Sequence, residues 1–269
     1  MMAQTYFDYL RNGRMSPHLP EQCSHCSMYF DAENFCAKLS DDELVALNAQ
    51  SSLVTIKRDE AVTEETQKLH PVMAISSGVL SLQHLLHDGR KTIAAILMRG
   101  DILDLRNSTR NQLGALIALN SVTLCRLSPV VFDAAIAENP QARMLAWANI
   151  TDQTFRAINH AADLAKKQAL EKLASFIFEI RNRDVRVPGN DHVHIPIRRR
   201  DLAEYLGMQP ETVSRCFKDL AGRGIIHVSD LSVIRILNAP ALRRISNGDR
   251  SPKGGRLDVP SFNVLVADA

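Results

Sequence analysis

The sequence lacks any apolar run long enough to cross a membrane. No stretch approaches the roughly eighteen consecutive apolar residues of a membrane-spanning helix. The N-terminal segment MMAQTYFDYLRNGRM also lacks the apolar run that a secretory signal carries after its charged residues. We therefore expect a soluble cytoplasmic protein with no membrane partner.

An excess of charge of one sign is missing as well. The net charge of +2 over 269 residues is too small to indicate a nucleic-acid partner by itself. Any attraction to phosphates must then come from a local patch, and basic residues do gather between residues 198 and 223. The hydrophobic content of 45% is enough for two modest domains, each with its own core, and argues against a disordered chain.

Cysteine is scarce, with five residues in the chain. In a cytosolic protein of this size, that number argues against a disulfide framework and for metal, redox or core roles. Cys23, Cys26 and Cys36 form a C-x2-C-x9-C pattern in an N-terminal segment of residues 1–38, and Cys125 lies in the strand-like stretch SVTLCRLSP. Cys216, much further along, is expected to be a packing or surface thiol.

Residues 39–138 carry the pattern of a small β-rich domain. Ser40 and Glu43 form a capping box at the start of a short helix. Short apolar runs separated by turn residues follow, and they indicate strands. The Asp88-Gly89 pair predicts a type I′ turn in a hairpin over residues 85–97. Strands at this spacing predict an antiparallel barrel or jelly roll.

A long helix is predicted over residues 139–166, because no proline or glycine lies between Pro140 and Arg181. Along it, apolar and small residues recur in steps of four and three, which is typical of two helices lying side by side. We call these residues the seam: Met144, Ala148, Thr151, Phe155, Ile158, Ala162 and Ala165. Dimerisation through the seam is the favoured interpretation, and packing of the same face on the chain's own barrel is the alternative.

A helix-turn-helix is predicted within a C-terminal domain of residues 167–245. The stretch RRRDLAEYLGMQPETVSRCFKDL, residues 198–220, holds the apolar interior of two helices. Gly207 falls at the turn between them, and Pro210 suits the first turn of the second helix, where its missing amide has no intrahelical acceptor. The runs IIHV and SVIRIL that follow predict the two strands of a wing. Residues 246–269 are expected to be disordered and receive no function.

The second helix of this motif carries a candidate reading face. Glu211, Ser214 and Arg215 stand at i, i+3 and i+4 and project from one side. Arginine binds guanine O6 and N7 together and glutamate accepts from cytosine N4, so the face suits readout of G·C pairs. Flanking cations are expected to meet phosphates: Arg198, Arg199, Arg200, Lys218 and Arg223. The alternative is an ordinary helical hairpin with solvated charges.

These features together resemble the CRP/FNR superfamily of bacterial regulators, over roughly residues 39–237. The stretch DLAEYLGMQPETVSR is similar to the FNR and FixK branch with its E-x-x-S-R reading face. The resemblance implies an α+β fold: a cyclic-nucleotide-binding-like jelly roll, a long dimer helix and a winged helix-turn-helix. It also implies a transcription regulator rather than an enzyme, with no catalytic residues. The expected operator is a TTGAT-like palindrome, with Glu211 and Arg215 on the G·C pair and Ser214 against thymine.

The barrel sequence argues against cAMP as the effector. Cyclic-nucleotide binders of this superfamily carry a G-E motif and an R-S or R-T pair, whereas this chain has GDILDLRNSTRNQLGALIAL in that region. Arg106 and Arg110 are therefore interpreted as surface charges.

The cysteines resemble the ligand set of FNR proteins, which implies that Cys23, Cys26, Cys36 and Cys125 hold a [4Fe-4S] cluster. The implied function is oxygen-responsive control of anaerobic or microaerobic genes, with double-stranded DNA, RNA polymerase and a second copy of the chain as partners. One alternative is a zinc site with His25 or Cys125 as the fourth ligand, and another is four thiols without a metal. A third is a regulator of the same fold that senses nitric oxide or haem ligands, or that has no effector. A C-x-x-C thiol oxidoreductase would require a βαβ context.

Overall fold

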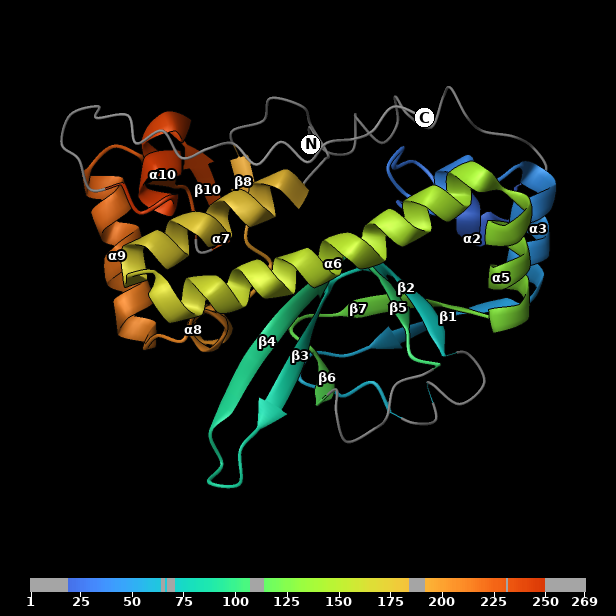
Figure 1. The fold of residues 1–269 in the computed structure, drawn as a ribbon, viewed down its shortest axis with the longest axis horizontal. Coiled ribbons are helices and arrows are strands. Elements are labelled where there is room, and N and C mark those ends of the chain that lie inside the picture. Colours follow the sequence, from blue (N-terminus) through green and yellow to red (C-terminus); the bar gives the residue numbers. More distant parts are fainter. Residues whose placement is uncertain are drawn as a thin grey trace.

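The computed structural model describes residues 19–63, 66, 71–106, 114–183, 192–230 and 232–249. One long helix, α6 (Pro140–Lys166), runs across the molecule from a group of short N-terminal helices to the C-terminal domain, with the strands of the barrel beneath it (Figure 1). The predicted fold class is confirmed: a β-rich N-terminal domain, a long helix and a C-terminal winged helix-turn-helix. Within the described ranges, no helix is both long and apolar enough to span a bilayer.

In the described part of the chain before the barrel lie the short helices α2 (Glu21–Ser24), the 3-10 helix η1 (Phe35–Lys38) and α3 (Asp41–Ala49). The predicted capping box begins α3. The Ser40 hydroxyl accepts from the Glu43 amide at 3.3 Å, and the Glu43 carboxylate accepts from the Ser40 amide at 2.6 Å. Two otherwise unpaired backbone donors are satisfied in this way, which sets where the helix starts.

The barrel consists of two antiparallel sheets. One has the order β1-β7-β2-β5 and the other the order β4-β3-β6. The strands are β1 (Ser51–Ile56), β2 (Val72–Ser77), β3 (Val79–Leu85), β4 (Lys91–Met98), β5 (Ile102–Asp104), β6 (Ala115–Ala118) and β7 (Val122–Leu127). Met73, Ile75, Leu80 and Leu124 are fully buried in the cluster between the sheets. This is the sandwich of inward-facing apolar residues that a jelly roll needs.

The turn of the β3–β4 hairpin differs from the prediction. A type I′ turn needs a positive φ at both central residues, but only Gly89, with φ of 85°, lies in the left-handed region here. The Leu86 amide donates to the Arg90 carbonyl at 2.7 Å, and the Gly89 amide donates to the Leu86 carbonyl at 3.0 Å. The hairpin is therefore closed by a three-residue loop that ends in a left-handed glycine, the geometry of a bulged hairpin.

The seam of α6 faces away from the barrel. Helix α5 (Pro129–Glu138) leads into α6, which packs on its own domain through the buried Ala142 and Ala146. All seven seam residues are exposed, and the large ones stay 57–63% exposed. Packing of the seam on the chain's own barrel, the alternative interpretation, is thus not what the structure has.

The C-terminal domain begins with α7 (Ala169–Arg183). It continues with β8 (His192–His194), α8 (Arg199–Leu206), α9 (Pro210–Gly222), β9 (Ile226–Val228), β10 (Val233–Ile236) and α10 (Ala239–Ser246). The two predicted wing strands, β9 and β10, pair as expected. However, β8 adds a third strand on β10, which the sequence analysis did not predict. Val193 is fully buried there, so its burial decides the conformation.

The C-terminal domain docks on the barrel through a shared apolar core. One buried cluster joins Val79, Ile93 and Ile96 of the β3–β4 sheet to residues of α7 and α8, including Leu173 and Leu202. Burial of apolar surface stabilises such a contact in proportion to its area. The position of the helix-turn-helix is therefore tied to the barrel domain.

His160 of α6 lies at the junction of α6 with this C-terminal domain. Its ring stacks on Tyr205 of α8, with centroids 3.8 Å apart and planes 5° from parallel. The residue is only 8% exposed, and burial lowers the pKa of its imidazole to about 4. Its Nε2 has no hydrogen-bond partner among the described residues. The folded protein therefore keeps this ring neutral at physiological pH.

This burial predicts a specific loss of stability in acid. In the unfolded state, His160 is protonated below a pH of about 6.5, whereas in the folded state it is protonated only below about 4. The free energy of unfolding therefore falls as the pH falls between these two values. Between about pH 7.5 and 5, the wild type should lose about 2 kcal/mol more free energy of unfolding than His160→Phe. Urea titrations of both proteins across this range measure it, and parallel pH profiles would refute it.

Candidate nucleic-acid interface and cysteine site

The turn between α8 and α9 is built as the sequence predicts. Gly207 has a φ of 60° and ends α8 in the left-handed conformation that glycine adopts without strain. Pro210 occupies the first turn of α9. Leu202 and Val213 are fully buried and Phe217 nearly so, so the inner faces of the two helices form the core of the motif. The outer face of α9 is left for other contacts.

Glu211, Ser214 and Arg215 are all exposed on that outer face. Neither Glu211 nor Arg215 forms an ion pair with another residue that the structure describes. The Ser214 hydroxyl donates to the Pro210 carbonyl at 3.0 Å, which leaves its acceptor lone pairs free to face outward. Helix α9 lies at the outer edge of the C-terminal domain (Figure 1). The three side chains can therefore approach a base-pair edge without rearrangement of the core.

The cations near the reading face fall into two groups. Arg200 and Lys218 are exposed and form no ion pair within the described part of the chain. Arg198 is instead bound to Asp201 at 2.8 Å and to Asp59 of the barrel at 2.7 Å. Its guanidinium thus bridges the two domains.

The other two flanking arginines are also engaged. The Arg199 guanidinium lies 3.4 Å from the centroid of the Phe217 ring, and its Nη1 is buried with no hydrogen-bond partner among the described residues. Burial lowers the pKa of Arg199. Arg223 pairs with Asp219 one turn earlier on α9, at 2.8 Å. Of the five expected phosphate contacts, Arg200 and Lys218 are therefore the two that form no ion pair or ring contact with the residues that the structure describes.

Four cysteines line one small cavity at the opposite end of α6. Cys23 comes from α2, Cys26 from the turn after it, Cys36 from η1 and Cys125 from β7. The remaining wall is mostly apolar and includes Met28, Leu44, Leu47 and Leu127. The fold thus brings Cys125 to the three N-terminal cysteines from 89 positions or more further along the chain.

His25 does not line this cavity. It is exposed, and its Nδ1 lies 3.1 Å from the Glu21 carbonyl and 2.8 Å from the Ser24 hydroxyl. The geometry therefore favours Cys125 over His25 as the fourth member of the set. Cys216, on α9, is buried and far from the other four in the fold.

The four thiols influence one another electrostatically. Burial raises the pKa of Cys36, and the neighbouring Cys26, Cys125 and Cys23 raise it further. Burial, followed by the charge of Cys26, raises the pKa of Cys23 to about 11 and that of Cys125 to about 12. Only groups close together in space act in this way. Metal binding at this site would have to displace protons from the thiols, because the thiolate is the ligand.

The donor set of this cavity fits a cluster with one cysteine per iron. Four thiols surround an apolar space, and soft thiolate sulfur is the ligand that iron–sulfur clusters use. No three His, Cys, Asp or Glu side chains within the described ranges converge closely enough to hold a single metal ion.

Arg106, which the sequence analysis interpreted as a surface charge, is paired with Asp104 and with Asp133, each at 2.6 Å. Arg110 lies outside the described residues.

One large exposed residue on the same face of α6 was not predicted as part of the seam. Trp147 is 61% exposed on α6, on the face that carries the seam residue Met144. Its spacing of three from Met144 and four from Thr151 matches the helical repeat, so the spacing itself could have placed it there.

Comparison with known proteins decides the family. The model of the Crp-like helix-turn-helix domain matches residues 171–245. The chain is also 32% identical over 211 residues to the nitrogen fixation regulation protein FixK of Bradyrhizobium diazoefficiens, a match that covers 77% of this chain and 86% of the relative. This chain belongs to the CRP/FNR superfamily. It lies on the FixK/FNR-like side, and the transcriptional activator protein FnrL of Cereibacter sphaeroides is 24% identical over 215 residues, 78% of this chain and 86% of FnrL.

A solved structure supports the same assignment for the fold. FixK2 from Bradyrhizobium japonicum superimposes with a TM-score of 0.61 at 26% identity, over 72% of this chain and 96% of FixK2. This CRP/FNR protein is thus a transcription regulator of the FixK/FNR type with a DNA-binding helix-turn-helix. The helical-hairpin alternative is set aside. The βαβ unit that a thiol oxidoreductase requires is not found either, since every strand pair described is antiparallel.

The two groups of cations should differ in the salt dependence of DNA binding. Each phosphate contact adds about 0.9 to the slope of log affinity against log salt concentration. Arg200→Ala should lower this slope by about 1 per protomer, whereas Arg198→Ala should lower it by less because Asp59 and Asp201 hold that side chain. Arg90→Ala, in the β3–β4 hairpin, is the control. An equal loss of slope in the Arg198 and Arg200 variants would contradict the grouping.

Proposed function

We propose that this protein is an oxygen-responsive regulator of anaerobic or microaerobic genes that binds TTGAT-like palindromes as a homodimer. The observation that carries the sensing part is the convergence of three cysteines of the N-terminal segment and Cys125 of β7 on one apolar cavity. The reading part rests on the exposed Glu211, Ser214 and Arg215. RNA polymerase as a partner and independence from cAMP are further expectations from the family resemblance.

Base readout is assigned to the outer face of α9. The Arg215 guanidinium can donate to both O6 and N7 of a guanine, and the Glu211 carboxylate can accept from N4 of the paired cytosine. Ser214 stands between them in the sequence and is exposed on the same face, where it can contact a thymine. Arg200 and Lys218 supply phosphate contacts that position the helix without reading sequence.

Dimerisation is assigned to the seam of α6. The exposed Met144, Phe155 and Ile158, together with Trp147, form an apolar surface that water would otherwise cover. Two copies that pair along this face would bury it and would hold two reading helices on one side of the dimer. A palindromic operator mirrors such a two-fold axis.

Cys23, Cys26, Cys36 and Cys125 are the residues that would hold a [4Fe-4S] cluster. When bound, such a cluster supplies an oxygen-sensitive centre. The chain's own contribution is to surround it with apolar side chains from α3 and β7, and to place it beside η1, which packs against α6. A zinc ion held by these thiols is the second candidate. The C-x2-C spacing suggests it, but the thiols would have to move closer together, because no three of them converge on one point in the described chain.

The readout assignment predicts the effect of Arg215→Ala. The variant should lose about 1–3 kcal/mol of discrimination between TTGAT-type sites and sites with the G·C pair replaced. Arg223→Ala removes a charge from the same helix, but one that is already paired with Asp219, and should leave discrimination unchanged. Competition binding with both DNA sequences provides the measurement. Unaltered discrimination in Arg215→Ala would remove the assignment.

The cluster assignment is tested by metal analysis after strictly anaerobic purification. The wild type should hold about four iron and four sulfide ions per chain, with an absorption spectrum that changes in air. Cys36→Ser should lose most of this iron and sulfide. Cys216→Ser, which changes a cysteine far from the cavity, should keep both. Zinc without sulfide would support the zinc site instead. A wild type that holds neither iron nor zinc would refute both the cluster and the zinc site.

A further inference from the structure

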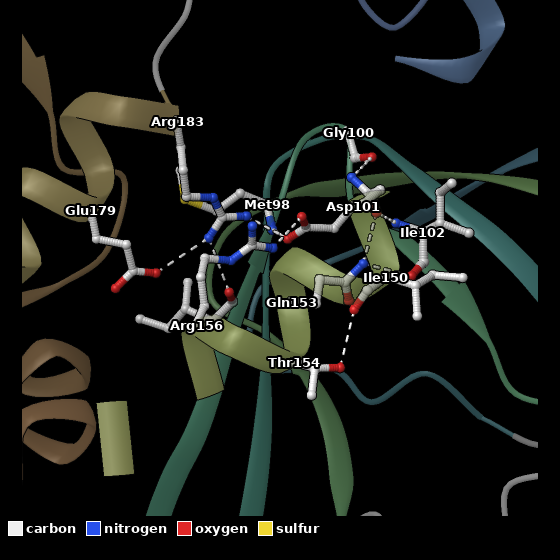
Figure 2. A network of polar contacts seen from close by, with 12 residues as sticks. Met98, Gly100, Asp101, Ile102, Ile150, Gln153, Thr154, Arg156, Glu179 and Arg183 are labelled. Atoms are coloured by element: carbon white, nitrogen blue, oxygen red, sulfur yellow. Dashed lines mark hydrogen bonds and ion pairs between the residues drawn. The ribbon is translucent and has the colours of Figure 1, made fainter. Parts of the chain in front are cut away.

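In the turn between β4 and β5, the buried carboxylate of Asp101 forms ion pairs with arginines of two helices (Figure 2). Asp101 is 3% exposed. Its Oδ1 accepts from Arg156 of α6 at 2.7 Å, and its Oδ2 accepts from Arg183 of α7 and from the Met98 amide, the latter at 2.8 Å. One side chain therefore joins the barrel, the long helix and the C-terminal domain.

The network continues from Arg183 to the helix-turn-helix. Arg183 also donates to the Ile96 carbonyl at 3.2 Å and lies 3.7 Å from the carboxylate of Glu179 (Figure 2). The Tyr205 hydroxyl, on α8, donates to Glu179 at 3.3 Å. Burial raises the pKa of Glu179. A chain of polar contacts thus runs from the β4–β5 turn to the first helix of the DNA-binding motif.

The same turn is bonded to the cysteine-bearing segment. Asn34 is 5% exposed, and its Nδ2 donates to the Gly100 carbonyl at 3.3 Å. Its Oδ1 accepts from the amide of Cys36 at 3.2 Å. A single buried side chain therefore links the backbone of a proposed cluster ligand to the residue before Asp101.

Helix α6 is tied to this turn by two further side chains. Asn149 accepts from the Ile102 amide at 2.9 Å and donates to the Gly100 carbonyl at 3.1 Å. Gln153 donates to the Ile102 carbonyl at 2.9 Å. Two carbonyls and one amide of the turn are thus occupied by α6 or Asn34, and a shift of η1 that carries Asn34 with it would break the bond to the Gly100 carbonyl.

We infer that the Gly100–Ile102 turn is the junction through which the cysteine segment sets the position of the DNA-binding domain, with Asp101 as a positioning residue for DNA binding. The part of the inference that concerns the cysteine segment rests on the proposed function. Asp101 touches no DNA; it acts through Arg183 and α7. A palindrome requires the two reading helices of a dimer to stand one helical turn of DNA apart, so it is sensitive to this position, whereas a lone half-site is not.

The test compares a palindrome with a single half-site, using the full-length chain. Asp101→Asn should weaken binding to the palindrome at least about tenfold, because Arg183 loses its buried partner, and should leave half-site affinity within about twofold. Hydrogen exchange of the α8 amides should become faster. Asp104→Asn is the matched control: it changes an aspartate of the adjoining strand β5, whose partner Arg106 lies within the barrel domain, and should match the wild type.

Substitutions on α7 keep the inference falsifiable if Asp101→Asn does not fold. Arg183→Met should reproduce the selective loss on the palindrome, and Arg183→Lys, which keeps the charge, should restore most of it. Equal losses on palindrome and half-site would indicate a merely structural role and overturn the inference. So would wild-type palindrome affinity in both Asp101→Asn and Arg183→Met.

The link to the cysteine segment is tested separately with Asn34→Ala. This variant keeps all four cysteines and should keep the iron and sulfide of the wild type. It should lose the difference in α8 hydrogen exchange between anaerobic and air-exposed protein. Persistence of that difference would overturn the role of Asn34. If the wild type holds no iron and sulfide, the proposed function fails, yet the effect of Asp101→Asn on the palindrome still decides the positioning role.

Discussion

The packing of α6 and α7 on the barrel depends on the pairing of one buried carboxylate, that of Asp101. A charge at the depth of Asp101 is costly unless it is paired and hydrogen-bonded, and its partners must therefore be held within reach. Those partners, Arg156 and Arg183, sit on α6 and α7, so the requirement fixes both helices against the barrel. The apolar core shared by the β3–β4 sheet, α7 and α8 acts in the same direction. The barrel domain and the DNA-binding domain are consequently packed against each other in this arrangement.

Two faces stay open once this packing is complete, and both belong to the expected function. The seam of α6 leaves large apolar side chains in water, and the outer face of α9 leaves Glu211 and Arg215 without ion-pair partners in the described chain. A third site, the cysteine cavity, lies at the far end of α6 from the reading helix. Helix α6 therefore runs from the cysteine cavity to the C-terminal domain, and its outer face carries the seam (Figure 1).

Helix caps and the helix-turn-helix turn follow from residues close together in the chain, whereas the type I′ turn predicted at Asp88-Gly89 was wrong and most contacts between distant residues were not predicted. The capping box at Ser40 and the turn at Gly207 depend on residues within one helical turn, so spacing alone predicts them. Strand β8 was missed because its burial comes from β10, and the pairing of Arg198 with Asp59 joins residues 139 positions apart. For the same reason the pairing of Asp101 with Arg156 and Arg183 was not predicted. The cysteines were found only because their chemistry is rare and three of them cluster in the chain.

Base-pair readout by the exposed Glu211 and Arg215 of α9 can be observed in a structure of the protein bound to a duplex that contains a TTGAT palindrome. We expect α9 in the major groove, with the Arg215 guanidinium about 3 Å from both O6 and N7 of the guanine. A complex in which α9 lies outside the groove, or in which Arg215 contacts only phosphate, would contradict it.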